Sequence, residues 1–495
     1  MELLKRNYII FSLALVFIGL NTFLIFNDIY YLNILPIVLI IVYIGVFHTK
    51  TAFLMLAFLT PISINLEEFT HGQIGLYLPT EPILFGLMLW IIIKELKSPV
   101  VHSNVWKHPI TLSLGFYLVW LFITSITSTS PLISFKFLLM KSWFIIPLIL
   151  LGTIVFVKKD NITKFLWAYG VGMSFVMIYT LIRHAGYDFG DREGHWVMEP
   201  IFKDHTIYGA AVAMNLFFVF GLLVYKKHAL HTQLILFFMF ILTLVALYFS
   251  YTRGAWLSVF FAIGVWFLIR YKIKFKYVIT IAGVIGAIVL ISWTQIEMRL
   301  AKNKHEHTTT NFEERLASST NMTSDASNLE RLTRWRAAFG MFKEKPVFGF
   351  GPGTYTFEYA PYQDPNKLTI ISTNFGTGGN AHSEYLGPLA ETGLIGMLSV
   401  LMFVAVLFYS GVTLLIHIKR YSPEEKQLYT LMLCVVLALS TYFFHGIINN
   451  YLDSDKAAVP VYGAAARIIA PQIRLLKKRK ANIASNNIVL YISIS

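Results

Sequence analysis

The sequence predicts an all-α polytopic integral membrane protein with about 12 to 14 transmembrane helices. Three observations support this fold class. Hydrophobic residues make up 56% of the 495 residues and charged residues only 14%, against about 25% charged residues in an average soluble domain. Apolar runs long enough to cross a hydrocarbon core of about 30 Å recur along the chain. Because that core holds no water, each run has to satisfy its own backbone hydrogen bonds as a helix.

Fourteen apolar segments are candidate spans. The third, fourth and last are weak, and several are short or contain a proline (Pro61, Pro82 and Pro460). In chain order the spans cover about 8 to 26, 30 to 47, 51 to 65, 80 to 94, 110 to 127, 132 to 157, 163 to 183, 207 to 225, 230 to 249, 254 to 270, 276 to 293, 384 to 416, 427 to 446 and 457 to 471.

The basic residues predict the orientation of these spans. The net charge is +14, but the Lys and Arg residues lie between apolar runs, where they indicate membrane topology rather than a nucleic-acid surface. Cytoplasmic loops carry an excess of cations, so we expect both termini to be cytoplasmic. If all fourteen segments cross, the following residues fall on that side: Lys5, Arg6, Lys50, Lys94, Lys97, Lys107, Lys158, Lys159, Lys226, Lys227, Lys272, Lys274, Lys276, Lys419, Arg420 and the tail LLKKRK.

The chain is expected to have four parts. Residues 1–293 form an N-terminal transmembrane bundle, and residues 294–381 form a large extracytoplasmic loop that is too long for a passive link. Residues 382–471 form the C-terminal transmembrane helices, and residues 472–495 a basic cytoplasmic tail. We expect disorder after Lys480 and a mobile polar segment at the start of the large loop.

The large loop contains one predicted amphipathic helix. Four apolar residues recur near helical spacing with arginines between them, so a helix lying on the membrane face is expected. Turns should follow in the segment KEKPVFGFGPGTY, whose glycines lack the Lys-Ser/Thr of a phosphate-binding loop. The apolar residues are Leu329, Leu332, Phe339 and Phe342, and the arginines are Arg331, Arg334 and Arg336.

The stretch from Asn374 to Gly396 is the predicted site, because a polar glycine-rich loop runs there into a long apolar segment. His382 is its one group with an unperturbed pKa near neutrality, about 6.5. If the helix begins near His382, a turn of about 100° per residue brings Gly393 nearly onto the same face, with Gly396 one turn later. Such glycines let a substrate or another helix approach closely. On spacing alone, a solvated histidine and helix-packing glycines are the commoner explanation.

Three blocks resemble the O-antigen ligase and Wzy polymerase family of bacterial membrane glycosyltransferases. His382 and Ser383, with Gly393 and Gly396 at their spacing, resemble the family signature. The segments YTRGAWL (Tyr251–Leu257) and TRWRAAFGMFKEKPVFGFGPGTY (Thr333–Tyr355) are similar to two further family blocks, in the family's order. Together they cover roughly the C-terminal half, and the N-terminal half matches only in its hydrophobic pattern. The resemblance implies a GT-C-like fold.

Two arginines on the predicted outer side are catalytic candidates beside His382. Arg253, in YTRGAWL, directly follows a span, where a charge is costly unless compensated. An arginine fork suits a diphosphate through bidentate hydrogen bonds, although Arg253 reaching lipid headgroups is the alternative. Arg192, in DREGHWVMEPIFKDHTIYG, resembles the family's arginine in this loop, although a surface ion pair explains a loop arginine as well.

Three further cations are candidate substrate contacts. Arg331 precedes Trp335 by one helical turn, which matches a family pattern, so it positions substrate or pins the loop. Lys136 and Lys141 lie in the outer half of the sixth span, where a lysine usually marks a cavity or a partner carboxylate. His195 and His205 lie beside acidic residues but without a recognised metal-ligand spacing, so we expect no metal.

The resemblance implies an O-antigen ligase-like enzyme at the outer face of the bacterial cytoplasmic (inner) membrane. It would transfer a glycan from undecaprenyl diphosphate to an acceptor hydroxyl with inversion, without a metal or cofactor. The implied partners are the undecaprenyl-diphosphate-linked donor, a lipid or glycan acceptor and membrane lipids, with no nucleic acid.

Two alternatives remain open. A repeat-unit polymerase of O-antigen or exopolysaccharide, or a protein O-oligosaccharyltransferase, would share the chemistry and differ in the acceptor. A polysaccharide or anionic-solute transporter or flippase would also suit many helices and outer cations, although transporters usually have paired halves with interrupted helices.

Overall fold

The computed structural model describes residues 2–28, 31–69, 75–273, 275–292, 326–364, 379–418 and 420–492. Almost all regular structure in these ranges is helical. The described strands are β1 (Ile64–Asn65) and β2 (Tyr77–Leu78), which pair antiparallel. The predicted all-α fold is confirmed. The predicted mobile segment at the start of the large loop, and Asn374 to Gly378 of the predicted site, lie outside the described residues.

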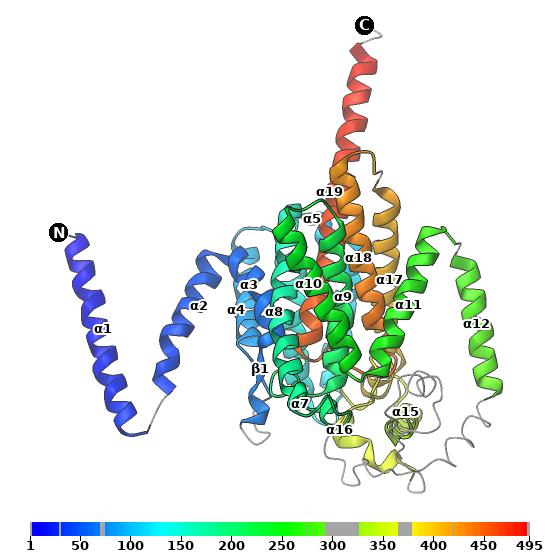
Figure 1. Ribbon diagram of the computed structural model, residues 1–495, viewed down its shortest axis with the longest axis horizontal. Coiled ribbons are helices and arrows are strands. Elements are labelled where there is room, and N and C mark those ends of the chain that lie inside the picture. Colours follow the sequence, from blue (N-terminus) through cyan, green and yellow to red (C-terminus); the bar gives the residue numbers. More distant parts are fainter. Residues whose placement is uncertain are drawn as a thin grey trace. The chain divides into compact units, whose positions relative to one another are not determined.

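Each of the fourteen predicted spans coincides with one helix (Figure 1). Eight helices of the described chain, α6 to α11, α17 and α18, have the length and apolar composition to cross a membrane. The helices are α1 (Glu2–Phe26), α2 (Leu35–Phe47), α3 (Thr49–Ile62), α4 (Thr80–Lys97), α6 (Pro109–Ile126), α7 (Pro131–Val155), α8 (Lys159–Ala185), α9 (His205–Val224), α10 (Leu230–Phe249), α11 (Arg253–Arg270), α12 (Phe275–Ile291), α17 (Leu386–His417), α18 (Pro423–His445) and α19 (Asp455–Ile492).

The chain divides into two compact units, Met1–Phe53 and Leu54–Ser495. The first unit holds α1, a short 3₁₀ helix η1 (Tyr31–Ile34), α2 and the start of α3. The second unit contains the helices that position the site. The short helices of this unit are η2 (Leu66–Glu68), α5 (Ser103–Trp106), η3 (Glu193–His195), α16 (Tyr355–Glu358) and η4 (Ala360–Tyr362).

Helices from both ends of the second unit pack into one bundle. Helix α9 lies against α8, α10 and α18, while α7 lies against α4, α6 and α19, and α17 packs along α6 (Figure 1). Nearly every residue of α9 is buried, as expected of a helix that is apolar all round. A Cβ atom at Gly221 would lie 2.9 Å from Cys434 Cβ. This small residue therefore allows the close approach of α9 and α18.

Helix α19 is held in the bundle by buried charges. The Lys456 ammonium donates to carbonyl oxygens at the C-terminal end of α3. These carbonyl groups have no helical N–H partner, because the helix ends there. Asp455 accepts from hydroxyl groups on either side of the β1–β2 pair. The Lys456 bonds go to Thr60 (2.9 Å), Pro61 (2.9 Å) and Ser63 (2.6 Å), and Asp455 accepts from Ser63 (2.6 Å) and from Thr80.

The expectation of disorder after Lys480 is wrong, because α19 continues as a helix to Ile492. The segment LLKKRKANIAS is polar, which suggested disorder from composition. However, Leu, Lys, Arg and Ala are all strong helix formers. An apolar helix already nucleated in the bundle can therefore extend through them at low cost.

The cap, defined here as residues Ala326–Asp364, contains the predicted amphipathic helix as α15 (Ala326–Glu344). Of its predicted apolar face, Phe339 is 47% exposed, whereas Ala337, Ala338 and Met341 of the same helix are fully buried. That the predicted face lies on the membrane stays a prediction. Arg334 is buried with these small residues. Its charge is compensated by Glu330 at 2.7 Å and by the ring of Tyr359, 4.2 Å from the guanidinium carbon. A hydrophobicity pattern cannot predict that an arginine is buried, because the burial depends on other groups that compensate its charge.

Candidate functional site

Helix α17 does not begin at His382, as the spacing argument assumed. It begins at Leu386, and His382 lies in the preceding turn with a φ of +48°. The helix is also broken at Gly393, whose φ of 71° and ψ of −170° are not helical. The predicted face shared by His382, Gly393 and Gly396 is therefore wrong, because the angle of about 100° per residue holds only within a continuous helix.

The cap fills the break in α17. N–H groups of the GFGPG turn donate to α17 carbonyl groups that the break leaves without helical partners, and an α17 N–H group beyond the break donates to a carbonyl group of the cap. The Trp120 indole nitrogen also donates to the Thr392 carbonyl at 2.9 Å. The backbone bonds are Phe350 N to Ala390 O (3.2 Å), Gly351 N to Glu391 O (2.7 Å) and Leu394 N to Pro346 O (2.9 Å).

The two predicted substrate-contact glycines are packed against the protein itself. A Cβ atom at Gly393 would lie 2.1 Å from the Val347 carbonyl oxygen, and one at Gly396 would lie 1.7 Å from Thr392 Oγ1. Gly393 also has a positive φ that glycine adopts most easily. The close contact at Gly393 is thus explained by docking of the cap onto α17, whereas Gly396 packs on residues of α17 itself.

His382 contacts its own loop and two other segments of the chain. Its N–H group donates to Asn380 Oδ1 at 2.9 Å, and its carbonyl accepts from Trp335 Nε1 of α15 at 3.4 Å. The Asn449 side chain lies within hydrogen-bonding reach of the imidazole, and its amide nitrogen is 2.8 Å from His445 Nε2. His382, Asn449 and His445 therefore form a polar chain at the end of α18.

Burial and the nearby charges of Arg331 and Arg334 lower the pKa of His382 to about 4. The sequence suggested proton exchange near neutrality, but a half-buried imidazole facing guanidinium groups favours the neutral form. At neutral pH His382 is therefore uncharged and can accept a proton.

Arg331 is the cation most directly linked to His382. Its Nε donates to the Ile448 carbonyl at 3.2 Å, one residue from Asn449. Its charge acts on the imidazoles of His382, His205 and His445. One helical turn later, the Trp335 indole N–H donates a hydrogen bond to the His382 carbonyl. Arg331 and Trp335 therefore attach the cap to the loop after α18 and to the His382 segment. Arg331 also places a positive charge near three imidazoles.

Arg253 begins α11 beside the same cluster and is half-buried. The preceding Thr252 hydroxyl donates to the His205 carbonyl at 2.7 Å. The following Gly254 packs so closely on the site that a Cβ atom there would lie 3.2 Å from His445 Cε1. The backbone on both sides of Arg253 is therefore held against two of the imidazoles.

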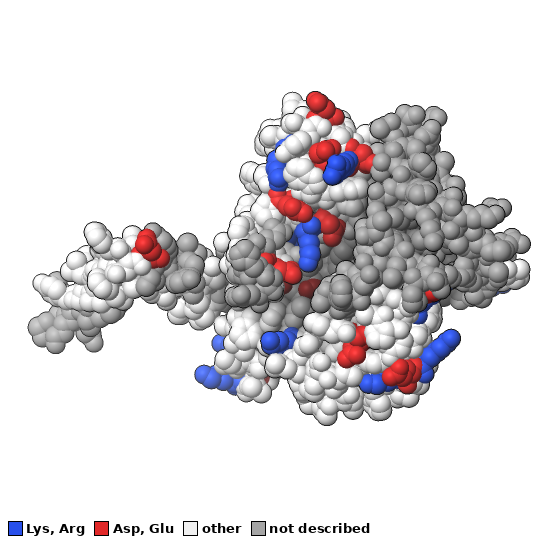
Figure 2. Space-filling view, turned by 90° about the horizontal axis from the view of Figure 1, so that it is seen from below, with Lys and Arg blue, Asp and Glu red and all other residues white. Residues whose placement is uncertain are grey.

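Arg192 lies at the start of η3 and is exposed. It is linked to the cluster through His195, three residues later, whose ring stacks on His205 with centroids 4.2 Å apart. Seen from the cap end of the molecule, Lys and Arg side chains lie interspersed with Asp and Glu (Figure 2).

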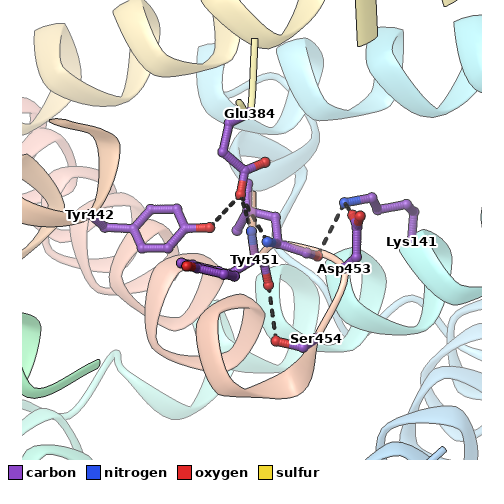
Figure 3. A network of polar contacts seen from close by, with 7 residues as sticks. Lys141, Glu384, Tyr442, Tyr451, Asp453 and Ser454 are labelled. Atoms are coloured by element: carbon purple, nitrogen blue, oxygen red, sulfur yellow. Dashed lines mark hydrogen bonds and ion pairs between the residues drawn. The ribbon is translucent and has the colours of Figure 1, made fainter. Parts of the chain in front are cut away.

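The structure separates the two lysines predicted on α7. Lys136 is exposed, whereas Lys141 is 3% exposed and lines a cavity of about 270 Å³ beneath the cap. Lys141 Nζ lies 2.6 Å from Asp453 Oδ1 and donates to the Leu452 carbonyl at 3.1 Å (Figure 3). Lys141 therefore has a carboxylate partner within the protein, and Lys136 is not among the residues that line the cavity.

Glu384, two residues after His382, was not singled out from the sequence. One of its oxygens accepts from the Tyr442 hydroxyl (2.5 Å), the Tyr451 N–H (2.6 Å) and the Leu452 N–H (2.9 Å) (Figure 3). Its own N–H donates to the Gly446 carbonyl at 2.8 Å. Burial raises the pKa of Glu384. Glu384 thus ties the His382 segment to the loop that follows α18.

The segment HGIINNYLDSDK (His445–Lys456) was also missed. It supplies His445, Asn449 and Asp453 to the site and its neighbouring cavity. A usable signal was present, since this polar run directly follows an apolar span on the same predicted side as His382. Among the described residues, no group of three or more His, Cys, Asp or Glu residues is arranged to hold a metal ion.

Comparison with known proteins places part of this site in a family. Residues 238–401 match the family model Wzy_C, described as O-Antigen ligase. The matched range includes Arg253, Arg331, His382 and both glycines of the signature. No curated protein matches the chain. Residues 238–401 of this multi-pass membrane protein are therefore similar to the O-antigen ligase family.

Proposed function

We propose that the protein transfers a glycan from undecaprenyl diphosphate to an acceptor hydroxyl at the outer face of the bacterial inner membrane. The observation that carries this proposal lies within the family-matched range. There, a neutral histidine, His382, adjoins Arg331. These groups supply what the reaction needs, namely a proton acceptor and positive charge for an anionic leaving group.

The acceptor oxygen attacks the anomeric carbon of the donor sugar, and the bond to the diphosphate oxygen breaks. The electron pair of that bond leaves with the diphosphate, and the acceptor proton passes to the His382 imidazole. A single displacement of this kind inverts the anomeric centre. Guanidinium forks at Arg331, Arg253 and Arg192 stabilise the charge that develops on the leaving group, each by an estimated few kcal/mol at most. The mechanism needs no metal ion.

The arginines also couple donor binding to the base. Arg331 and Arg334 lower the pKa of His382 in the protein alone. A bound diphosphate carries negative charge and offsets these cations, so it raises the pKa of His382 back toward about 6.5. The His382 imidazole therefore becomes a stronger base when the donor is bound. Without the donor it is a weaker base, and it activates water less.

The membrane orientation rests on charge placement. The cap, the loop with Arg192 and the start of α11 fall on the side opposite to the lysine-rich loops if all fourteen helices cross. By the positive-inside rule both termini are then cytoplasmic and the site faces outward. An outward site suits a donor already activated by its diphosphate, because no nucleotide is needed.

The acceptor separates the proposed ligase from the two related activities. A ligase delivers finished glycan to a lipid, a repeat-unit polymerase extends another lipid-linked glycan, and a protein O-oligosaccharyltransferase modifies a protein. A deletion strain tests this directly. Accumulation of long glycan still attached to the polyprenyl carrier supports a ligase, whereas accumulation of single repeat units indicates a polymerase.

Transfer itself is tested with purified protein, a lipid-linked glycan and an acceptor, in detergent and with a chelator present. The proposal predicts glycosylated acceptor without any ion gradient or nucleotide. The opposite result is an intact donor in this assay together with movement of the donor across sealed vesicles. That combination would assign the protein to transport.

A further inference from the structure

We infer that the cavity beneath the cap binds an uncharged, hydroxyl-rich sugar ring of the acceptor, whereas the diphosphate binds on the arginine side of His382. This inference rests on the proposed function and names the part of the substrate that this cavity takes. Lys141, a predicted substrate contact, lines this cavity with its charge already paired by Asp453.

The size of the cavity suits one sugar ring. Its volume of about 270 Å³ is near the lower end of small-molecule pockets, which begin at about 300 Å³. A polyprenyl chain or an extended glycan does not fit such a space. The cavity lies between α6, α7 and α17 and the 446–454 loop, with the cap above it.

The charge of the cavity disfavours a phosphate group. Lys141 is its one Lys or Arg residue among the described lining residues, and Asp453 neutralises it at 2.6 Å. Glu384 and Glu391 also line the cavity. An anion entering here would meet carboxyl groups and a lysine already paired, so the electrostatic match is poor.

The same lining offers hydrogen bonds to hydroxyl groups. The side-chain oxygen of Asn450 is buried without a hydrogen-bond partner among the described residues. Tyr117, Tyr462 and Asn380 add further polar groups to the lining. A buried acceptor without a partner is costly, and a ligand hydroxyl supplies the missing donor.

The cavity lies next to the segment that carries His382, and His382 itself is not among its lining residues. Asn380, Ala381 and Ser383, the chain neighbours of His382, all line it. Arg331 is bonded to Ile448 and is not among the lining residues. In a single displacement the attacking oxygen and the leaving oxygen lie on opposite sides of the anomeric carbon. With the diphosphate beside Arg331, the attacking hydroxyl comes from the cavity.

Gly387 provides a way to fill the cavity without disturbing the fold. It lies in the first turn of α17 and lines the cavity, and a Cβ atom there would meet only Ala381 Cβ, at 3.8 Å. Gly387→Leu therefore places a side chain in open space. Gly387→Ala adds one methyl group in ordinary contact and is the matched control.

The first test measures transfer kinetics of the Gly387→Leu protein. We expect the acceptor KM to rise about tenfold or more, while the donor KM stays unchanged and the Gly387→Ala protein, which loses the volume of one methyl group only, shows a smaller rise. An unchanged acceptor KM, or a rise confined to the donor KM, would overturn the inference. Equal unfolding temperatures of the Gly387→Leu and Gly387→Ala proteins would show that the difference in acceptor KM arises in the cavity and not from a loss of stability.

The second test does not depend on activity, so it separates this inference from the proposed function. Thr356 lines the cavity, and the single cysteine of the sequence, Cys434, is buried. A Thr356→Cys, Cys434→Ala protein is labelled with a maleimide in the presence of methyl glucoside, N-acetylglucosamine or inorganic pyrophosphate. We expect the neutral sugars to slow labelling and pyrophosphate to leave it unchanged. Protection by pyrophosphate alone, or by none of the probes, would contradict the inference.

Discussion

At the scale of single residues, the proposed chemistry depends on the protonation state of His382. Its side chain is half-buried beside Arg331 and Arg334, and these surroundings lower its pKa to about 4. The group that serves as base must be neutral, so activity falls as the pH drops through this pKa. The neutral form is present throughout the physiological range.

The first prediction concerns pH. With the donor varied, kcat/KM reports the free enzyme, so its acid limb is expected near pH 4 rather than near the unperturbed value of about 6.5. The acid limb of kcat is expected at higher pH. The bound diphosphate offsets the positive charge of Arg331 and so raises the pKa of His382 in the donor complex. Steady-state rates measured from acid to neutral pH check both limbs. Coincident limbs near 6.5 would mean that the arginines do not act on His382.

The second prediction concerns Arg253. Arg253→Lys keeps the charge but removes the planar fork, so transfer should fall at least about tenfold at normal protein levels. Arg270→Lys, at the other end of the same helix and exposed, is the control and should leave transfer unchanged. Equal rates for the two proteins would show that Arg253 does not hold the diphosphate.

The sequence predicted some of these residues and not others for a physical reason. His382 and Arg331 lie in motif blocks and the structure brings them together. Glu384 and Asn449 act through partners far away in the chain, namely the Leu452 N–H for Glu384 and the His382 imidazole for Asn449. No local pattern records such pairs, because they form only when α17 and α18 are packed.

At the scale of elements, the break in α17 links the signature to the cap. The sequence located both glycines but assigned them to a continuous helix. The break depends on backbone bonds from Phe350, Gly351 and Pro346, which lie more than one helix away in the chain. Helix α15 shows the same limitation, because the burial of Arg334 depends on Glu330 and on the distant ring of Tyr359.

The third prediction tests this docking. Gly393→Ala would place a methyl group 2.1 Å from the Val347 carbonyl oxygen at a φ of +71°, and the backbone strain alone costs about 1 to 3 kcal/mol. We expect a lower unfolding temperature in detergent and faster proteolysis of the cap. Gly387→Ala, in open space on the same helix, should change neither. Similar behaviour of the two variants would argue against docking of the cap at Gly393.

At the scale of the whole molecule, hydrophobic segments predicted the helices well. All fourteen segments contain one, because a long apolar run has few alternatives to a helix. The packing of α9 on α18 and of α7 on α19 could not be predicted, since it depends on side-chain fit between distant segments. This packing brings Lys141 next to Asp453.

The fourth prediction concerns orientation. Lys343 on α15 and Lys227 between α9 and α10 are both exposed, and they lie on opposite sides if the positive-inside rule holds. In a Cys434→Ala background, a membrane-impermeant maleimide added to intact cells should label Lys343→Cys and spare Lys227→Cys until the membrane is permeabilised. The reverse pattern would place the site in the cytoplasm.

The central claim is that His382 takes the acceptor proton during transfer from a lipid-linked donor. The most direct measurement follows labelled glycan and released polyprenyl diphosphate in proteoliposomes containing wild-type, His382→Ala or His417→Ala protein. His417 is exposed at the far end of α17 and serves as the matched control. We predict equal amounts of both products with wild type and His417→Ala, and a loss of about 10²- to 10⁴-fold with His382→Ala. Undiminished transfer by a folded His382→Ala protein would contradict the account.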